Sequence, residues 1–71
     1  MANDVTHVLA RNEFDEYIVL SHSTRFSLNE TIAFDADEDG FITDWGEIAT
    51  WHGDPDFAAY AKELGYELVK E

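Results

Sequence analysis

The chain has 71 residues, which is enough for one domain built around a single hydrophobic core. Sixteen Asp and Glu residues stand against four Lys and Arg residues, and the formal net charge of −12 argues against direct binding to nucleic acid or to an anionic membrane, because negative charges repel each other. Since there is no cysteine, disulfide bonds and the usual cysteine-based zinc sites are excluded.

The first part of the chain predicts a β-hairpin. Residues 5–10 are rich in β-branched and apolar side chains and predict a first strand. Residues 17–20 (Tyr-Ile-Val-Leu) predict a second strand, and the polar segment 11–16 predicts the connection between the two.

The middle of the chain predicts another hairpin around an acidic turn. Residues 31–37 alternate, with Ile32, Phe34 and Ala36 on one face, as a half-buried strand requires. Residues 37–40 (Asp-Glu-Asp-Gly) suit a type I turn that ends on a left-handed glycine.

The segment after this turn has two interpretations. Residues 41–47 predict the returning strand, but burying either face leaves an apolar side chain outside unless Gly46 marks a bulge. A short helical turn over residues 44–51 is the alternative. The choice of strand or helix for residues 44–52 therefore stays open.

A helix is predicted near the C-terminus. Asp54 is a suitable N-cap, Pro55 fits the first helical position, and Gly65 fits the position just past the end. Four residues between them have the spacing of one buried helical face: Phe57, Tyr60, Ala61 and Leu64.

Residues 66–69 alternate again and predict an added edge strand. The order of these elements predicts an α+β fold for a single domain over residues 1–71, with a small antiparallel sheet of about four strands and one C-terminal helix packed on one face. The core of so short a chain is thin, which favours a homodimer or another protein partner.

Residues 35–43 copy the beginning of an EF-hand calcium loop. Asp35, Asp37 and Asp39 occupy the first three ligand positions, and Gly40 stands where the loop must bend. The position of the bidentate glutamate is Gly46, so the copy is incomplete. We favour a charged hairpin turn, and a single calcium-binding module with these three aspartates as ligands is the alternative.

The same acidic segment suggests nucleic-acid mimicry. Carboxylates two residues apart on one face of a strand are separated by about 6.6 Å, which is similar to the spacing of phosphates along a nucleic acid. Asp35 and Asp37 have this spacing in sequence, and Asp39 and Asp44 lie nearby. A DNA mimic that occupies a nucleic-acid-binding protein is therefore the second hypothesis for function.

No enzyme site or cofactor site is recognised. Ser21, His22 and Ser23 place hydroxyls beside an imidazole, but adjacent strand residues point to opposite faces and cannot form a catalytic relay alone. The sequence also lacks a glycine-rich phosphate loop and a His-Glu metal motif. We expect a protein that is not an enzyme and binds no cofactor.

Trp45, Trp51 and Tyr60 are the best candidates for a partner-binding surface, because aromatic side chains dominate binding hot spots. In so small a chain they also supply the core. The core is the favoured interpretation for Trp45, and both interpretations stay open for Trp51. The acidic residues Asp35, Asp37, Asp39 and Asp44 are the other candidates for contact with a partner.

A series of short motifs extends from residue 17 to residue 67: Ser21-His22-Ser23, Asn29-Glu30-Thr31, Ile32-Ala33-Phe34, Ala36-Asp37, Gly40, Ile42-Thr43-Asp44-Trp45, Glu47-Ile48 and Gly65-Tyr66-Glu67. In these motifs the chain resembles small acidic accessory proteins of unknown function encoded by tailed phages of actinobacteria. That family often has proline where this sequence has Asp35, a change that lets the strand run on towards the turn.

The resemblance implies a setting and no chemical activity. Small accessory phage proteins commonly act by binding a host protein, which is the leading hypothesis for this chain. The N-terminal residues 1–4 have neither a basic segment nor an apolar run, and no run in the sequence has the length of a membrane span. We therefore expect the protein in the cytoplasm of the host cell, with no membrane partner.

Overall fold

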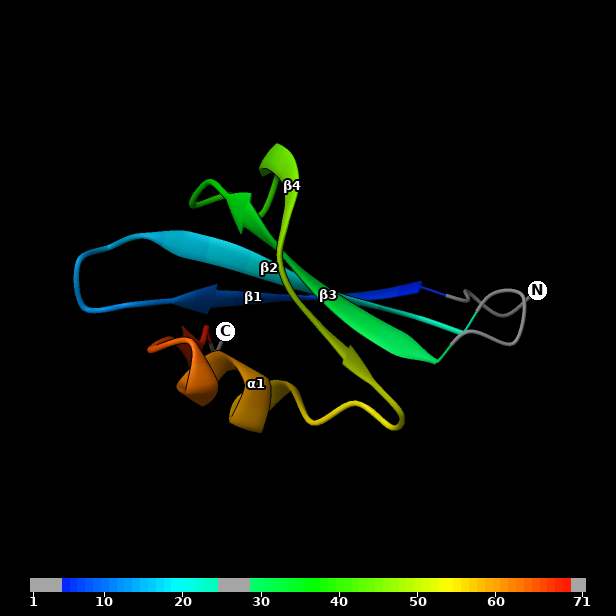
Figure 1. Ribbon diagram of the computed structural model, residues 1–71. Coiled ribbons are helices and arrows are strands. Elements are labelled where there is room, and N and C mark those ends of the chain that lie inside the picture. Colours follow the sequence, from blue (N-terminus) through cyan, green and yellow to red (C-terminus); the bar gives the residue numbers. More distant parts are fainter. Residues whose placement is uncertain (1–4, 25–28, 70–71) are drawn as a thin grey trace.

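The computed structural model describes residues 5–24 and 29–69. In this part of the chain a five-stranded sheet with the order β4-β3-β2-β1-β5 is covered on one side by a single helix (Figure 1). The elements are β1 (Val5–Arg11), β2 (Tyr17–Ser23), β3 (Glu30–Ala36), β4 (Ile42–His52), α1 (Phe57–Glu63) and β5 (Glu67–Leu68). All neighbouring strands are antiparallel, so the predicted α+β fold is confirmed. The short β5 is the edge strand that the alternation in residues 66–69 predicted, and it brings the sheet to five strands where about four were expected.

The first hairpin forms where the sequence predicts it. β1 and β2 pair from Val5 opposite Ser23 to Arg11 opposite Tyr17. In the connection, the Asn12 side-chain oxygen accepts hydrogen bonds from the backbone N–H groups of Phe14 and Glu16, both at 2.9 Å. This local hydrogen bonding is typical of asparagine in turns and fixes the register of the hairpin.

The turn between β3 and β4 is also as predicted. Asp37 N–H donates to the Phe41 carbonyl at 2.9 Å, Gly40 N–H donates to the Asp37 carbonyl at 3.0 Å, and Gly40 has φ 87°. The Asp37 carboxylate accepts from the N–H groups of Asp39 and Phe41, both at 3.0 Å. These bonds make the acidic segment a structured hairpin turn.

β4 is a strand with a large bulge, and the helical alternative for residues 44–52 is wrong. Ala33 lies opposite Ala49, and Asp35 lies opposite Asp44. Four residues of β4, 45–48, therefore lie opposite a single residue of β3, Phe34. Gly46 lies inside this bulge as predicted, and the Asp44 carboxylate accepts its N–H at 2.8 Å.

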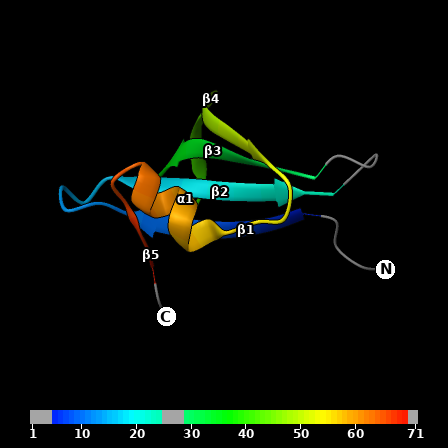
Figure 2. The same cartoon turned by 60° about the horizontal axis from the view of Figure 1, so that its bottom comes forward.

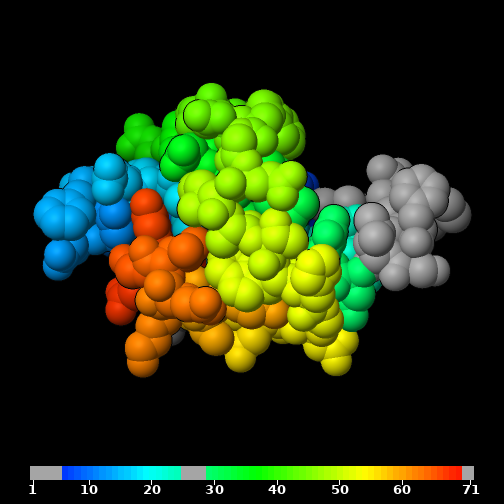
Figure 3. Space-filling view, viewed as in Figure 1, coloured from blue at the N-terminus to red at the C-terminus, as the bar shows by residue number. Residues whose placement is uncertain are grey.

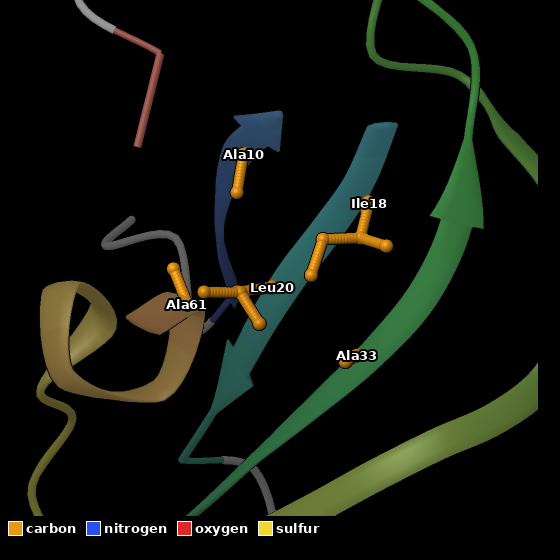
Figure 4. Close-up of a cluster of buried hydrophobic side chains, with 5 residues drawn as sticks. All are labelled: Ala10, Ile18, Leu20, Ala33 and Ala61. Carbon is orange, nitrogen blue, oxygen red and sulfur yellow. The ribbon is translucent and has the colours of Figure 1, made fainter. Parts of the chain in front are cut away.

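α1 packs over β1 and β2 and closes the core (Figure 2). The innermost residues are Ala10, Ile18, Leu20, Ala33 and Ala61, all fully buried (Figure 4). Around them pack the other three residues of the predicted helical face, together with Trp51, Tyr66 and Leu68. The predicted buried face of the helix is therefore confirmed, and small Ala61 and Ala33 allow the helix to approach the sheet closely.

The N-cap of α1 is Asp56, so the prediction of Asp54 is wrong by two residues. The Asp56 carboxylate accepts the N–H of Ala59 at 3.2 Å, as a capping side chain does. Pro55 consequently precedes the cap. At the other end Gly65 has φ 86°, and Tyr66 N–H donates to the Ala61 carbonyl at 2.8 Å, which confirms the predicted glycine termination.

The helix covers the less apolar of the two faces that the alternation pattern gave to β3. Thr31 and Ala33 are fully buried on the helix side, whereas Ile32 and Phe34 lie on the opposite side of the sheet. The reason is that Ala33 pairs with Leu20 and Thr31 pairs with His22, both of which face α1. An apolar sheet face is thus left without a covering helix among the described residues.

Candidate protein-binding surface

Large apolar side chains are exposed at and just before the bulge of β4. Phe41 is 70% exposed, Trp45 is 72% exposed and Ile48 is 44% exposed. We call these three residues the β4 patch. Figure 3 shows the bulged segment, in yellow-green, projecting from the surface of the molecule. The interpretation of Trp45 as a core residue is therefore wrong.

Trp45 is held in place although it is exposed. Its ring meets the ring of Phe34 edge to face, with centroids 5.3 Å apart and planes at 61°. Phe34 is almost fully buried and lies on the sheet face opposite α1. Because an edge-to-face contact favours one ring orientation, the exposed indole is pre-organised for contact with another molecule.

Trp51 has a different role, since it lies on the helix side of the sheet. Its ring stacks on Tyr60 with centroids 4.4 Å apart and planes at 8°, and its indole N–H donates to the Glu63 carboxylate at 3.2 Å. These contacts tie the end of β4 to α1. The structure therefore places the two tryptophans on opposite faces, and they form no common surface.

The four aspartates proposed for partner or metal contact are only partly brought together. Asp35 and Asp44 are cross-strand neighbours in β3 and β4. The Asp37 carboxylate is engaged by two backbone N–H groups inside the turn, and Asp39 lies exposed at its tip. Asp35, Asp37 and Asp44 line one open depression, whereas Asp39 is not part of its lining.

No metal-binding arrangement of three or more His, Cys, Asp or Glu side chains occurs in residues 5–24 and 29–69. The aspartates at the first EF-hand positions, Asp35, Asp37 and Asp39, are thus not gathered as a ligand set. Their segment links two strands, whereas the EF-hand loop links two helices. The geometry favours the hairpin-turn interpretation.

Acidic groups gather instead around an open depression at one end of the sheet. Its lining includes Asp15, Glu16, Asp35, Asp37, Glu38 and Asp44. The nearby Tyr66 side chain is affected, because burial raises the pKa of its phenol and the charges of Glu16 and Asp35 raise that pKa further. This end of the molecule is its clearest concentration of negative charge in the described part of the chain.

His7, His22 and His52 lie on three different strands, β1, β2 and β4. His22 is buried, its Nδ1 is 2.7 Å from the Thr31 hydroxyl, and its ring meets Phe57 edge to face. His52 is 79% exposed in its side chain, with Nδ1 4.0 Å from a Glu30 oxygen. The pairing of His22 with Thr31 escaped the sequence analysis, although the register of a β2–β3 hairpin would have placed the two residues opposite each other.

Comparisons of the chain with protein-family models, curated proteins and solved structures found no match. Within residues 5–24 and 29–69, no helix has both the length and the apolar character needed to cross a membrane. The β4 patch is therefore described only by the exposure and contacts of its own residues.

Proposed function

We propose that this protein is a non-enzymatic accessory protein that binds one host protein stoichiometrically through the β4 patch. The observation that carries the proposal is the exposure of Trp45, at 72%, on a strand that belongs to the ordered sheet. Tryptophan is the residue type most enriched at binding hot spots, because its large ring removes much apolar surface from water when it is covered.

The neighbours of Trp45 strengthen the proposal. Phe41, just before β4, and Ile48, within the bulge, add exposed apolar surface close to Trp45 in sequence. A large exposed apolar patch marks an interaction surface. The acidic groups Asp44 and Glu47 accompany this apolar centre in sequence, which resembles the arrangement of an apolar core with a charged rim. The host setting is proposed from the resemblance to accessory proteins of actinobacterial phages.

The test is affinity capture from a lysate of an actinobacterial phage host. Wild-type protein, the Trp45→Ala variant and the Phe14→Ala variant are used as baits. Phe14 is a matched control, because it is 74% exposed but lies in the β1–β2 connection. We expect wild type and Phe14→Ala to retain one partner in equal molar amount, and Trp45→Ala to lose it. Equal capture by Trp45→Ala and wild type would contradict the proposal.

A second candidate function is mimicry of nucleic acid, and the acidic depression favours it. Six carboxylates from the β1–β2 connection, β3, the following turn and β4 line one open surface. Such a surface attracts the basic groove of a nucleic-acid-binding protein. The first function depends on apolar side chains and the second on carboxylates, so the two differ in their response to salt, which provides a direct way to separate them.

A further inference from the structure

The outer side of β4 is an open sheet edge among the described residues. β4 ends the strand order at one side, whereas β5 lies beyond β1 at the other side. Edge strands expose unpaired N–H and C=O groups, and proteins usually guard them with lysine, proline, bulges or short length. The first half of β4 is guarded, since the Asp44 carboxylate already accepts the N–H of Gly46.

The second half of β4 has much less protection. Residues 48–52 (Ile-Ala-Thr-Trp-His) contain neither lysine nor proline, and residues 49–52 pair with β3 in regular register. Thr50 and His52 have exposed side chains, and Ile48 remains 44% exposed. This segment is therefore regularly paired with β3, apolar in part and accessible, as an added strand requires.

The hydrogen-bond pattern shows which backbone groups point outwards. Gly53 N–H donates to the Asn29 carbonyl at 2.7 Å, one step beyond the pair of Glu30 with His52. In an antiparallel ladder, hydrogen-bonded and non-hydrogen-bonded pairs alternate. Trp51 and Ala49 therefore direct their N–H and C=O groups towards β3, while His52 and Thr50 direct theirs away from the sheet.

Carboxylates flank this open edge. Glu47 accepts a hydrogen bond from the Thr50 hydroxyl at 3.1 Å, and Glu30 lies 4.0 Å from the exposed His52 ring. A second copy of this chain would bring a further formal charge of −12 to the interface, which disfavours self-association. A strand with basic side chains would instead meet opposite charges across the ladder.

We propose that β4 binds its partner by β-strand addition, and that the occupant is an extended, lysine- or arginine-bearing segment of another protein. The segment pairs antiparallel or parallel with the outward N–H and C=O groups of Thr50 and His52. Its basic side chains lie beside Glu47 and Glu30, and its apolar side chains continue onto the β4 patch. This inference rests on the proposed function and specifies how the partner is held.

The test uses an end-blocked peptide of alternating lysine and valine as the probe. Its controls are the same peptide with glutamate in place of lysine and the lysine peptide N-methylated at every residue. The methylated peptide keeps the charge but cannot donate backbone hydrogen bonds. We expect the lysine peptide to bind at least about tenfold more tightly than the glutamate peptide at low salt. The N-methylated peptide should not bind.

Amide hydrogen exchange provides the decisive readout. On binding of the lysine peptide, exchange at Thr50 and His52 should slow by about tenfold or more, because their N–H groups gain acceptors. Exchange at Ala49 and Trp51, whose N–H groups already face β3, should change little. Equal binding of the lysine and N-methylated peptides, or the absence of protection at Thr50 and His52, would overturn strand addition.

Variants separate this inference from the proposed function. Thr50→Pro removes one outward N–H without removing a bond to β3, and Thr50→Ala keeps that N–H while removing the same hydroxyl. We expect Thr50→Pro to abolish peptide binding and Thr50→Ala to retain it. If Thr50→Pro fails to fold, the N-methylated and glutamate peptides still decide whether the edge of β4 binds an added strand.

Capture of the host partner by the same variants is the remaining comparison. If Thr50→Pro folds and retains a host partner that Trp45→Ala loses, the β4 patch binds the partner and strand addition is overturned. If wild type captures no host partner, the proposed function fails, while the peptide experiment still decides whether the edge accepts a basic strand. A dimer in sedimentation that Thr50→Pro dissociates would identify a second copy as the occupant and overturn the basic-segment assignment.

Discussion

The rings of Trp51 and Tyr60 lie nearly parallel, with centroids 4.4 Å apart, and join the end of β4 to the only helix in the described part of the chain. The Tyr60 hydroxyl donates to the Asp54 carbonyl at 3.2 Å, so the same side chain also holds the link between β4 and α1. α1 has seven residues, and a helix of that length is unstable by itself in water. Its stability therefore depends on this contact and on the buried Ala61.

The stacked pair leads to a prediction about stability. Trp51→Ala should lower the free energy of unfolding by about 2–3 kcal/mol, less than for a fully buried tryptophan, because Trp51 is half-buried. Urea unfolding followed by far-ultraviolet circular dichroism measures the change. Trp45→Ala is the matched control and should cost less than about 1 kcal/mol, since its ring is mostly exposed. Equal losses for the two variants would contradict the different roles assigned to the two tryptophans.

The buried contact of His22 with Thr31 makes a second prediction. Thr31→Val preserves the shape of the side chain but leaves the His22 ring nitrogen without its partner, at a cost of about 1–3 kcal/mol. His22→Leu with Thr31→Val removes both polar groups, so the double variant should be more stable than the sum of the single losses implies. A double-mutant cycle from urea unfolding measures the coupling, and strictly additive losses would argue against a hydrogen bond.

The cap of α1 supplies a third prediction. Asp56→Ala should destabilise the protein by about 0.5–2 kcal/mol, because the N–H of Ala59 loses its acceptor. Asp54→Ala should change stability by no more than about 0.5 kcal/mol, because that side chain is exposed and its bond from Asn29 is long, at 3.4 Å. Thermal melting compares the two variants. The opposite order of stabilities would restore Asp54 as the cap.

The position of this cap shows where sequence reasoning reached its limit. The buried face of the helix was predictable, since the apolar spacing allows only one side to meet the sheet. The residue at which the helix starts was not predictable, because Asp54-Pro55-Asp56 contains two good capping residues on either side of the proline. The choice depends on the path from His52 to the helix, which Gly53 permits with φ 96°.

The faces of β3 and β4 show a second limit, which affects the candidate surface directly. Alternation in residues 31–37 correctly predicted a strand, but it left open which of the two faces the helix covers. The helix covers Ala33 and Thr31, because packing space and the His22 contact decide the face. The bulge opposite Phe34 then turns Trp45 outwards, an outcome that no local pattern around Trp45 specifies.

Salt dependence separates the two proposed functions. A mimic replaces phosphates with carboxylates, so its complex should weaken steeply with salt and be displaced by duplex DNA. A complex centred on Trp45 should survive about half-molar salt, because at that concentration charges are screened within a few ångströms while burial of apolar surface is not weakened. We therefore expect the captured host partner to remain bound in high salt and in the presence of DNA.

Charge reversal tests the same distinction from the side of the protein. Asp35 and Glu38 are exposed and line the acidic depression, and neither belongs to the β4 patch, although Asp35 pairs with Asp44 beside the bulge. The double variant Asp35→Lys/Glu38→Lys should leave capture of the host partner within about threefold of wild type at half-molar salt, since screening reduces the remaining charge effects. Circular dichroism confirms that the variant is folded. If this variant loses the partner while Trp45→Ala keeps it, and DNA competes with the wild-type complex, the protein acts as a nucleic-acid mimic and the β4 patch is not the binding surface.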